Sequence, residues 1–174
     1  MRFAFALLVA AACGGPPASN TPSRPASPST SPAATAHELI ATLERTECHG
    51  FCPVYSVTVY RDGALEYQGT RHVKLIGPAT GHVSPDQIAA LDRLFQSKGY
   101  LGLQDSYTSH TVTDLPSIKT SYTPAGQPTK SVDHYRGDRS APEALTEIEN
   151  GVDDIVQINQ WIGTDEERRA AMGR

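Results

Sequence analysis

Cys48 and Cys52 are separated by three residues and could form a disulfide, half of a metal site or a redox-active pair. A zinc site needs about four ligands, and His49 is the only candidate close to these cysteines in the sequence. A thioredoxin-like pair has two intervening residues and precedes a helix, whereas here a strand-like run follows. The spacing is compatible with a bond across a tight turn between two strands. We therefore expect a structural disulfide, with redox and metal roles as the alternatives.

The segment Gly102–Pro116 is the second place where side chains could do chemistry. It combines carboxylates, hydroxyls and a histidine with few apolar residues, and the candidate binding residues are Asp105, Tyr107, His110 and Asp114. A carboxylate beside a histidine suits acid–base catalysis or the binding of a hard cation. The same residue types also stabilise loops by bonding to backbone groups. We therefore expect a binding loop and assign no catalytic residue, metal ligand or cofactor.

Three further histidines, His72, His82 and His134, fall on strand-like segments and are expected to lie on the surface or to be paired. His134 and its neighbour Asp133 could approach the polar loop if their strand pairs with it. The chain has no Gly-rich phosphate loop, no Gly-x-Ser-x-Gly elbow and no His-Glu-x-x-His motif.

Alternating apolar and polar residues predict an antiparallel meander of three or four strands in the first half of the domain. Asp62-Gly63 is typical of a two-residue hairpin turn. The expected strands are Leu39–Leu43, Tyr55–Tyr60, Leu65–Tyr67 and Val73–Leu75, with Gly77-Pro78 interrupting the last.

A helix is predicted from Ser84, with Pro85 at its first position, Gln87 completing a capping box and Gly99 ending it. Its apolar face consists of Ile88, Leu91, Leu94 and Phe95. Two more strands, Ser117–Thr123 and Gln127–Tyr135, are expected on either side of a turn at Pro124-Ala125-Gly126.

A second helix is expected to open at Ser140, with Pro142 in its first turn, and Trp161 is expected to close the core at its end. The order of strands, helix, strands and helix predicts an α+β domain with two helices packed on one face of an antiparallel sheet. The domain is expected to span residues 37–162, followed by a charged tail at 163–174 that frays.

The charge of the domain argues against nucleic-acid binding. All nineteen acidic residues lie after position 36, whereas two of the fifteen basic residues, Arg2 and Arg24, lie before it. Residues 37–174 therefore carry a formal charge of −6 (thirteen basic against nineteen acidic), which repels phosphate backbones.

The first twelve residues, with Arg2 followed by an apolar run, predict an export signal that is too short to span a bilayer. Residues 8–15 resemble the bacterial lipoprotein signal, which implies lipidation of Cys13, although Ala10 stands where that pattern usually has leucine. The alternative is ordinary cleavage after Ala12. Residues 13–36 are rich in Pro, Ser and Thr and are expected to form a disordered tether. We expect a cell-envelope protein held to a membrane through Cys13, with the outer membrane favoured because no acidic residue follows this cysteine closely.

Several motifs resemble an uncharacterised bacterial family, domain-of-unknown-function family 6438. They are Arg45-Thr46, Cys48-x-Gly50-x-Cys52-Pro53-Val54-Tyr55, Asp62-Gly63, Tyr67-x-Gly69, Asp105-x-Tyr107, Asp114-Leu115-Pro116 and Tyr135. The resemblance implies an exported or lipid-anchored protein without an established activity, and it supplies no catalytic residues. It also implies that the cysteine turn and the polar loop belong to one framework.

The leading hypothesis is a cell-envelope lipoprotein with a small non-enzymatic domain that binds an envelope protein or a cell-wall component. The first alternative is a small hydrolase or metal-dependent enzyme of the envelope that uses Asp105, His110 and Asp114. The second is a thiol–disulfide redox protein that uses Cys48 and Cys52.

Overall fold

The computed structural model describes residues 37–109 and 113–172. The expected export signal, Cys13 and the tether lie outside the described residues. None of the described helices is both long and apolar enough to cross a membrane.

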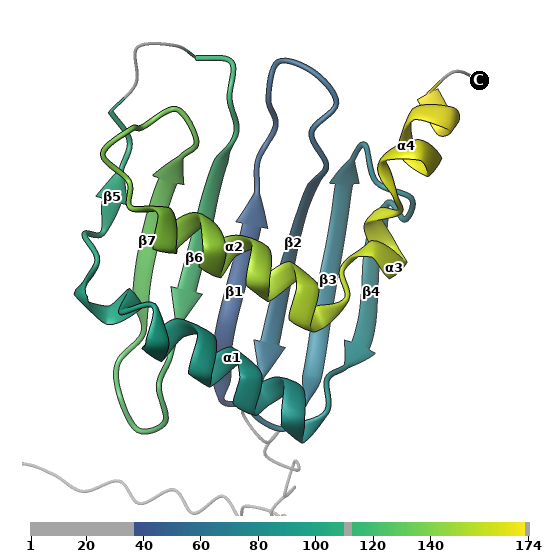
Figure 1. Cartoon of the computed structure of the whole chain (residues 1–174). Helices are drawn as coiled ribbons and strands as arrows, with labels where there is room; N and C mark the ends of the chain where they lie inside the picture. The colour runs from purple at the N-terminus through teal and green to yellow at the C-terminus, as the bar shows by residue number, and fades with distance from the viewer. Residues whose placement is uncertain (1–36, 110–112, 173–174) are drawn as a thin grey trace, which may run out of the picture. The chain divides into compact units, whose positions relative to one another are not determined.

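The described residues form one seven-stranded sheet whose strands follow the order β4-β3-β2-β1-β6-β7-β5 (Figure 1). The strands are β1 Leu39–Arg45, β2 Val54–Tyr60, β3 Ala64–Arg71, β4 Gly77–His82, β5 Ser106–Tyr107, β6 Ser117–Tyr122 and β7 Lys130–Tyr135. All neighbours pair in the antiparallel sense except β5 and β7, which are parallel. The two-residue alternation of the sequence sets the two faces, because successive side chains of a strand point to opposite sides.

The helices α1 (Pro85–Ser97) and α2 (Glu143–Val156) cover one face of this sheet (Figure 1). A 3₁₀ turn at Tyr100–Gly102 follows α1, and the short helices α3 (Asn159–Ile162) and α4 (Asp165–Met172) follow α2. This arrangement confirms the predicted α+β fold and the predicted order of its elements.

Local signals fixed the ends of α1. The Ser84 hydroxyl accepts from the Gln87 N–H at 3.3 Å, and the Ser84 N–H donates to Oε1 of Gln87 at 2.9 Å, which forms the predicted capping box. After the helix, Gly99 adopts φ = 67°, a conformation that is strained for residues with a Cβ atom.

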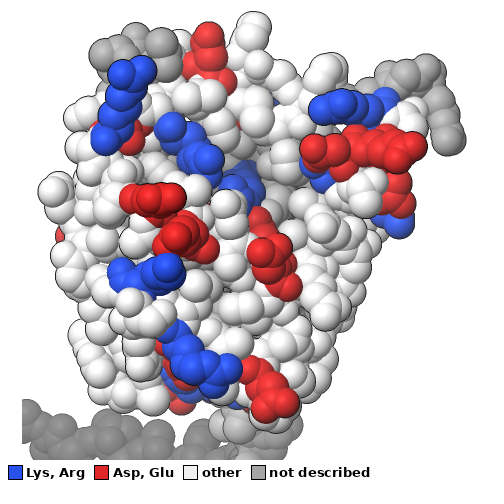
Figure 2. Space-filling view, in the orientation of Figure 1, with Lys and Arg blue, Asp and Glu red and all other residues white. Residues whose placement is uncertain are grey.

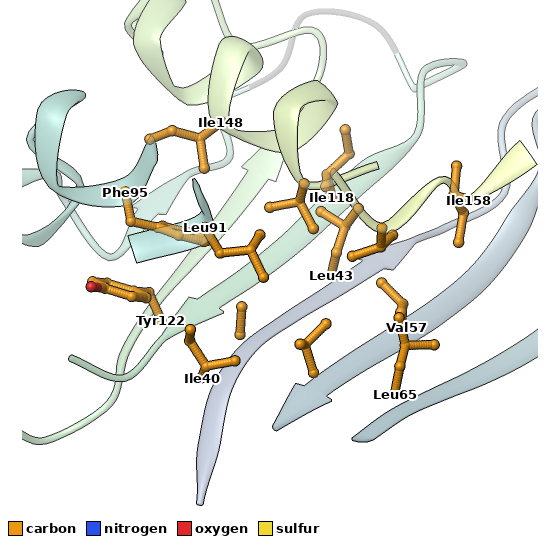
Figure 3. Packing of buried hydrophobic residues seen from close by; sticks show 14 of the residues in the cluster. Ile40, Leu43, Val57, Leu65, Leu91, Phe95, Ile118, Tyr122, Ile148 and Ile158 are labelled. Carbon is orange, nitrogen blue, oxygen red and sulfur yellow. The ribbon is translucent and has the colours of Figure 1, made fainter. Parts of the chain in front are cut away.

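The core lies between α1, α2 and the sheet (Figure 3). Leu91 and Phe95 of α1 and Ile148 of α2 belong to one buried cluster with Leu43 of β1 and Ile118 of β6. Each large apolar side chain buried in this way contributes about 1.5–3 kcal/mol relative to exposure. On the same face, towards the β4 edge of the sheet, Trp161 stacks on Tyr67 with ring centroids 5.3 Å apart, which confirms its expected role in closing the core.

The fourth strand differs from the prediction. Gly77-Pro78 begins β4 instead of interrupting a strand, and Val73–Leu75 lies in the loop before it. The N–H groups of Lys74 and Leu75 donate to the carbonyls of Ile162 and Trp161 in α3, at 3.0 and 2.9 Å. These bonds replace strand pairing, and Pro78 is tolerated because β4 is an edge strand.

The second helix also begins later than predicted, at Glu143, with Pro142 as its N-cap residue. Ser140 instead bonds to the Asp138 carboxylate through its hydroxyl and its N–H.

The tail that we expected to fray contains helix α4, which Thr164 and Glu167 cap. The Thr164 N–H donates to Oε2 of Glu167 at 2.8 Å, and the Glu167 N–H donates to the Thr164 hydroxyl at 3.2 Å. The residues form a Thr-x-x-Glu capping box.

Candidate functional site

The cysteine turn connects β1 to β2 at one end of the sheet. Cys48 and Cys52 form a disulfide with their Cα atoms 5.7 Å apart. The N–H of His49, inside this turn, donates to the carbonyl of Asp114 at 2.9 Å. The cysteine turn and the polar loop are therefore in direct contact, as the family resemblance implied.

A second set of bonds joins the same two segments. The Thr46 N–H and hydroxyl both donate to the Ser117 carbonyl at 3.0 Å, and the Ser117 N–H donates back to the Thr46 hydroxyl at 2.8 Å. Together these bonds extend the pairing of β1 with β6 by one residue beyond the end of β1 and fix the base of the cysteine turn.

A pocket of about 260 Å³ lies beneath this junction. It is lined by side chains from β1, β2, β6, α2 and α3 and from the connecting loops: Arg45, Thr46, Cys52, Pro53, Tyr55, Pro116, Ile118, Asn150, Asp153 and Ile162. We call it the disulfide-end pocket. Its walls are mainly apolar, and its polar groups gather around Arg45.

Arg45, Tyr55 and Asp153 form a closed network from β1, β2 and α2. Nη2 of Arg45 lies 2.7 Å from Oδ2 of Asp153, and Nε of Arg45 donates to the same oxygen at 2.9 Å and to the Tyr55 hydroxyl at 3.0 Å. The Tyr55 hydroxyl donates to Oδ1 of Asp153 at 2.7 Å. Arg45 also donates to the Glu149 carbonyl and to Oδ1 of Asn150, both at 3.2 Å. The network ties the two strands to α2.

Burial governs the electrostatics of this network, since the side chains of Arg45 and Asp153 are each only 15% exposed. Burial raises the pKa of Tyr55, and the Asp153 carboxylate raises it further. Burial lowers the pKa of Arg45, but the electrostatic interactions with Asp153 and Tyr55 have the larger combined effect, so that the pKa of Arg45 is raised. Burial also raises the pKa of Asp153, against the opposing effects of Arg45 and Tyr55. Tyr55 is therefore a protonated donor at neutral pH and not a nucleophile.

The polar loop runs along the far edge of the sheet. Asp105 forms an ion pair with Lys130, and its carbonyl accepts from the Asp133 N–H at 2.9 Å. Strand β5 then pairs with β7, so that Tyr107 lies opposite His134. The loop thus approaches the Asp133–His134 strand, an arrangement that the sequence allowed but could not establish. Tyr107 is buried, and its hydroxyl accepts from the Gln104 N–H at 3.1 Å.

The four candidate binding residues do not form one cluster in the described part of the chain. Asp105 contacts Lys130, whereas Asp114 contacts the cysteine turn through its carbonyl, and no contact joins these two aspartates among residues 37–109 and 113–172. His110 lies outside the described residues. Asp138 holds the intervening loop by accepting from the Ser109 N–H at 2.8 Å. The bonds from Ser140 and Ser109 hold the pKa of Asp138 below its ordinary value.

His134 is a buried, paired histidine, as expected, and its partner Glu149 is one that the sequence did not reveal. Nδ1 of His134 lies 2.6 Å from Oε1 of Glu149, whose side chain is fully buried on α2. Nη1 of Arg136 lies 3.7 Å from the other carboxylate oxygen. The signal that could have identified Glu149 is a carboxylate within the apolar stripe Leu145–Val156.

The surface charge forms no patch of one sign on the face shown in Figure 2, where acidic and basic side chains are interspersed. Among the described residues, no group of three or more His, Cys, Asp or Glu side chains is placed to hold a metal ion.

These features define a small α+β domain with a disulfide-bonded turn and a pocket built on a buried ion pair. The chain belongs to the family described as domain of unknown function (DUF6438), whose model matches residues 40–156. The match confirms the resemblance and spans the cysteine turn, the polar loop and the whole of α2. No curated protein matches the chain.

Proposed function

We propose that the protein is a lipid-anchored component of the bacterial cell envelope whose domain binds an envelope protein or a cell-wall component without catalysing a reaction. The observation that carries this proposal is the disulfide-end pocket. Six of its lining residues, Arg45, Thr46, Cys52, Pro53, Tyr55 and Pro116, belong to the motifs on which the family resemblance rests. Residues that identify the family thus converge on one surface feature.

The chemistry of the pocket supports binding. The positive charge of Arg45 is balanced by the carboxylate of Asp153, and both side chains bond to Tyr55. The Tyr55 proton is engaged in a hydrogen bond to Asp153. Such a network stabilises a shape and leaves no free base or nucleophile to start a reaction. The apolar walls formed by Pro53, Pro116 and other residues suit a partner that inserts an apolar group.

Exposed apolar side chains surround this end of the domain, where the β1–β2 and β3–β4 loops extend beside the described residues 113–116 that lead into β6 (Figure 1). Phe51 is 65% exposed, Ile76 is 60% exposed and Leu115 is 44% exposed. Phe51 packs edge-on against the ring of His72 with centroids 5.4 Å apart, which links the first two loops. Exposed apolar groups beside a pocket are typical of protein-binding surfaces.

The position of the first described residues also supports this proposal. His37 pairs with Asp62 near the β2–β3 turn, at the opposite end of the sheet from the disulfide. An anchor attached through the preceding residues would therefore join the domain at that end and leave the disulfide end available to a partner.

Leu115 and Leu101 offer a matched test because both are 44% exposed and only Leu115 lies in the loops at the disulfide end. The lipidated chain is used to capture partners from envelope extract, and the captured proteins and muropeptides are compared among wild type, Leu115→Ser and Leu101→Ser. We expect a reproducible partner that Leu115→Ser loses and Leu101→Ser retains. Equal capture by both variants, or no component specific to wild type, would contradict the proposed surface.

A further inference from the structure

The sheet face opposite α1 and α2 is polar. Side chains on this face alternate along each strand with the buried core residues, and they are mostly hydroxyls, amides and charged groups. The pairing registers align one row across six strands: Thr80, Glu66, Thr58, Thr42, Ser121 and Ser131. Five of the six members of this row therefore carry a hydroxyl group.

This face is hollowed. Two adjoining hollows of about 640 and 320 Å³ share Ser56 and Thr58, so that they form one groove that crosses the strands from β7 to β4. Six strands at a spacing of about 4.8 Å give the groove a length of roughly 24 Å. We call it the hydroxyl groove. It is separate from the disulfide-end pocket, because the two have no lining residue in common.

The groove is weakly acidic. Lys119 lies 3.8 Å from Glu44, and Lys130 pairs with Asp105, so that two acidic lining residues are balanced. The other two acidic lining residues, Glu66 and Asp133, are not balanced by a basic residue of the lining. Glu66 accepts a hydrogen bond from the Tyr60 hydroxyl, which leaves its charge in place. Phosphate or carboxylate polymers would meet repulsion here, and neutral chains would not.

One atom of the groove is unsatisfied. Asp133 lines the groove, and its Oδ1 is buried without a hydrogen-bond partner among the described residues. An unpaired buried acceptor is costly, and native proteins rarely keep one without a reason. A rotation of the Asp133 side chain that turns this oxygen into the groove would let a ligand hydroxyl donate to it, and this bond would remove the cost.

We propose that the hydroxyl groove binds a neutral glycan chain that runs across the strands. Each sugar hydroxyl both donates and accepts, as do the Ser and Thr hydroxyls that line the groove. The extended shape suits a polymer better than a compact ligand, and the acidic excess favours an uncharged polymer. This proposal does not depend on the disulfide-end pocket.

The test is a titration of the ¹⁵N-labelled full chain, carrying Cys13→Ser, with three probes: chitohexaose, cellohexaose and anionic polygalacturonate. We expect at least one neutral probe to give saturable shifts in the amide signals of β1, β2 and β6, and we expect polygalacturonate to give none. Absence of saturable shifts with both neutral probes, or tighter binding of polygalacturonate, would overturn the proposal.

Thr58→Val provides the decisive variant because valine keeps the β-branched shape and removes only the hydroxyl. Thr70→Val is the matched control, since Thr70 is exposed on β3 and lies outside the lining of both hollows. We expect Thr58→Val to weaken binding about fivefold, the effect of one lost hydrogen bond, and Thr70→Val to leave it unchanged. Equal effects would place the binding elsewhere.

Asp133→Leu supplies an independent readout. It is expected to abolish or strongly weaken binding without lowering the unfolding temperature, because Oδ1, one of the two oxygens that it removes, is buried without a partner in the free protein. If the same signals shift with protein concentration alone and sedimentation shows a dimer, a second copy covers the groove and the glycan proposal fails.

Discussion

At the scale of residues, Arg45, Tyr55 and Asp153 depend on one another. Two buried charges are expensive to remove from water, and they are tolerated here because each has several hydrogen-bond partners. The Tyr55 hydroxyl fills the remaining position between the guanidinium and the carboxylate. Without this hydroxyl, Arg45 and Asp153 would each lose one hydrogen bond in a buried site.

We therefore expect Tyr55→Phe to lower the free energy of unfolding by about 1–3 kcal/mol, measured by urea denaturation. Tyr60→Phe serves as the control, because the Tyr60 hydroxyl makes a bond to Glu66 that is exposed to solvent. Its effect should remain within about 0.5 kcal/mol. Similar losses for both variants would show that the buried network adds no stability of its own.

The buried tyrosines make a pH prediction. Burial raises the pKa of Tyr67 from its ordinary value of 10 to about 12, and burial also raises the pKa of Tyr55 and Tyr100. The folded protein keeps these protons at a pH where the unfolded chain loses them. The contribution of these tyrosines to stability is therefore fully present below pH 10, and it falls as the pH rises from 10 towards 12.

Tyrosinate absorbance in the ultraviolet checks this prediction directly. Tyr60, which is only half-buried, should ionise before Tyr55, Tyr67 and Tyr100, and these three should ionise only at higher pH or together with unfolding. A single reversible step near 10 that accounts for all seven tyrosines in the folded protein would contradict it.

The sequence showed some of these residues and not others, for a physical reason. Cys48 and Cys52 are near neighbours in the chain, so their spacing, the lack of further metal ligands nearby and the strand-like run after them were enough to predict the bond. Arg45 and Tyr55 appeared in the family motif, but their partner Asp153 lies on α2, and nothing local relates it to them. Glu149 was missed for the same reason, because His134 pairs with it only after α2 packs on the sheet.

At the scale of elements, the cysteine turn couples two connections. It joins β1 to β2 and also contacts the polar loop through the His49 N–H, so its closure positions both sides of the disulfide-end pocket.

We expect the double change Cys48→Ser and Cys52→Ser to reduce stability by about 2 kcal/mol, the chain-entropy value for so short a loop. Hydrogen exchange of the His49 amide should accelerate, because this N–H bonds to Asp114 only while the turn holds its shape. Export should be unaffected. Unchanged exchange at His49 would show that the turn is held by the other contacts alone.

Elements with strong end signals were predicted well, and those set by their surroundings were not. The Ser84 capping box and Gly99 act within a few residues, and they fixed α1. We expected the fourth strand before Gly77 because Gly and Pro usually interrupt strands. Gly77 and Pro78 can belong to a strand here only because β4 lies at the edge of the sheet. The Thr164-x-x-Glu167 capping box of α4 is visible in the sequence, but we expected the tail to fray because it is highly charged.

At the scale of the whole molecule, the proposed lipidation would decide where the domain can act. If the lipoprotein signal is used, Cys13→Ser should abolish metabolic labelling with palmitate and release the protein from the membrane fraction, while the domain keeps its unfolding temperature. Persistent palmitate labelling of this variant would contradict lipidation at Cys13, and a wild-type protein cleaved after Ala12 without labelling would support plain secretion.

The first strand of the domain is also its middle strand. β1 follows directly on the residues that would lead to an anchor, and it is hydrogen-bonded on one side to β2 and on the other to β6, both antiparallel. Tension between a membrane and a bound partner would thus pull β1 along its own axis and load two ladders of hydrogen bonds in shear at once. A domain attached in this way is suited to carrying mechanical force, and stretching single molecules from the N-terminal side would measure how much it withstands.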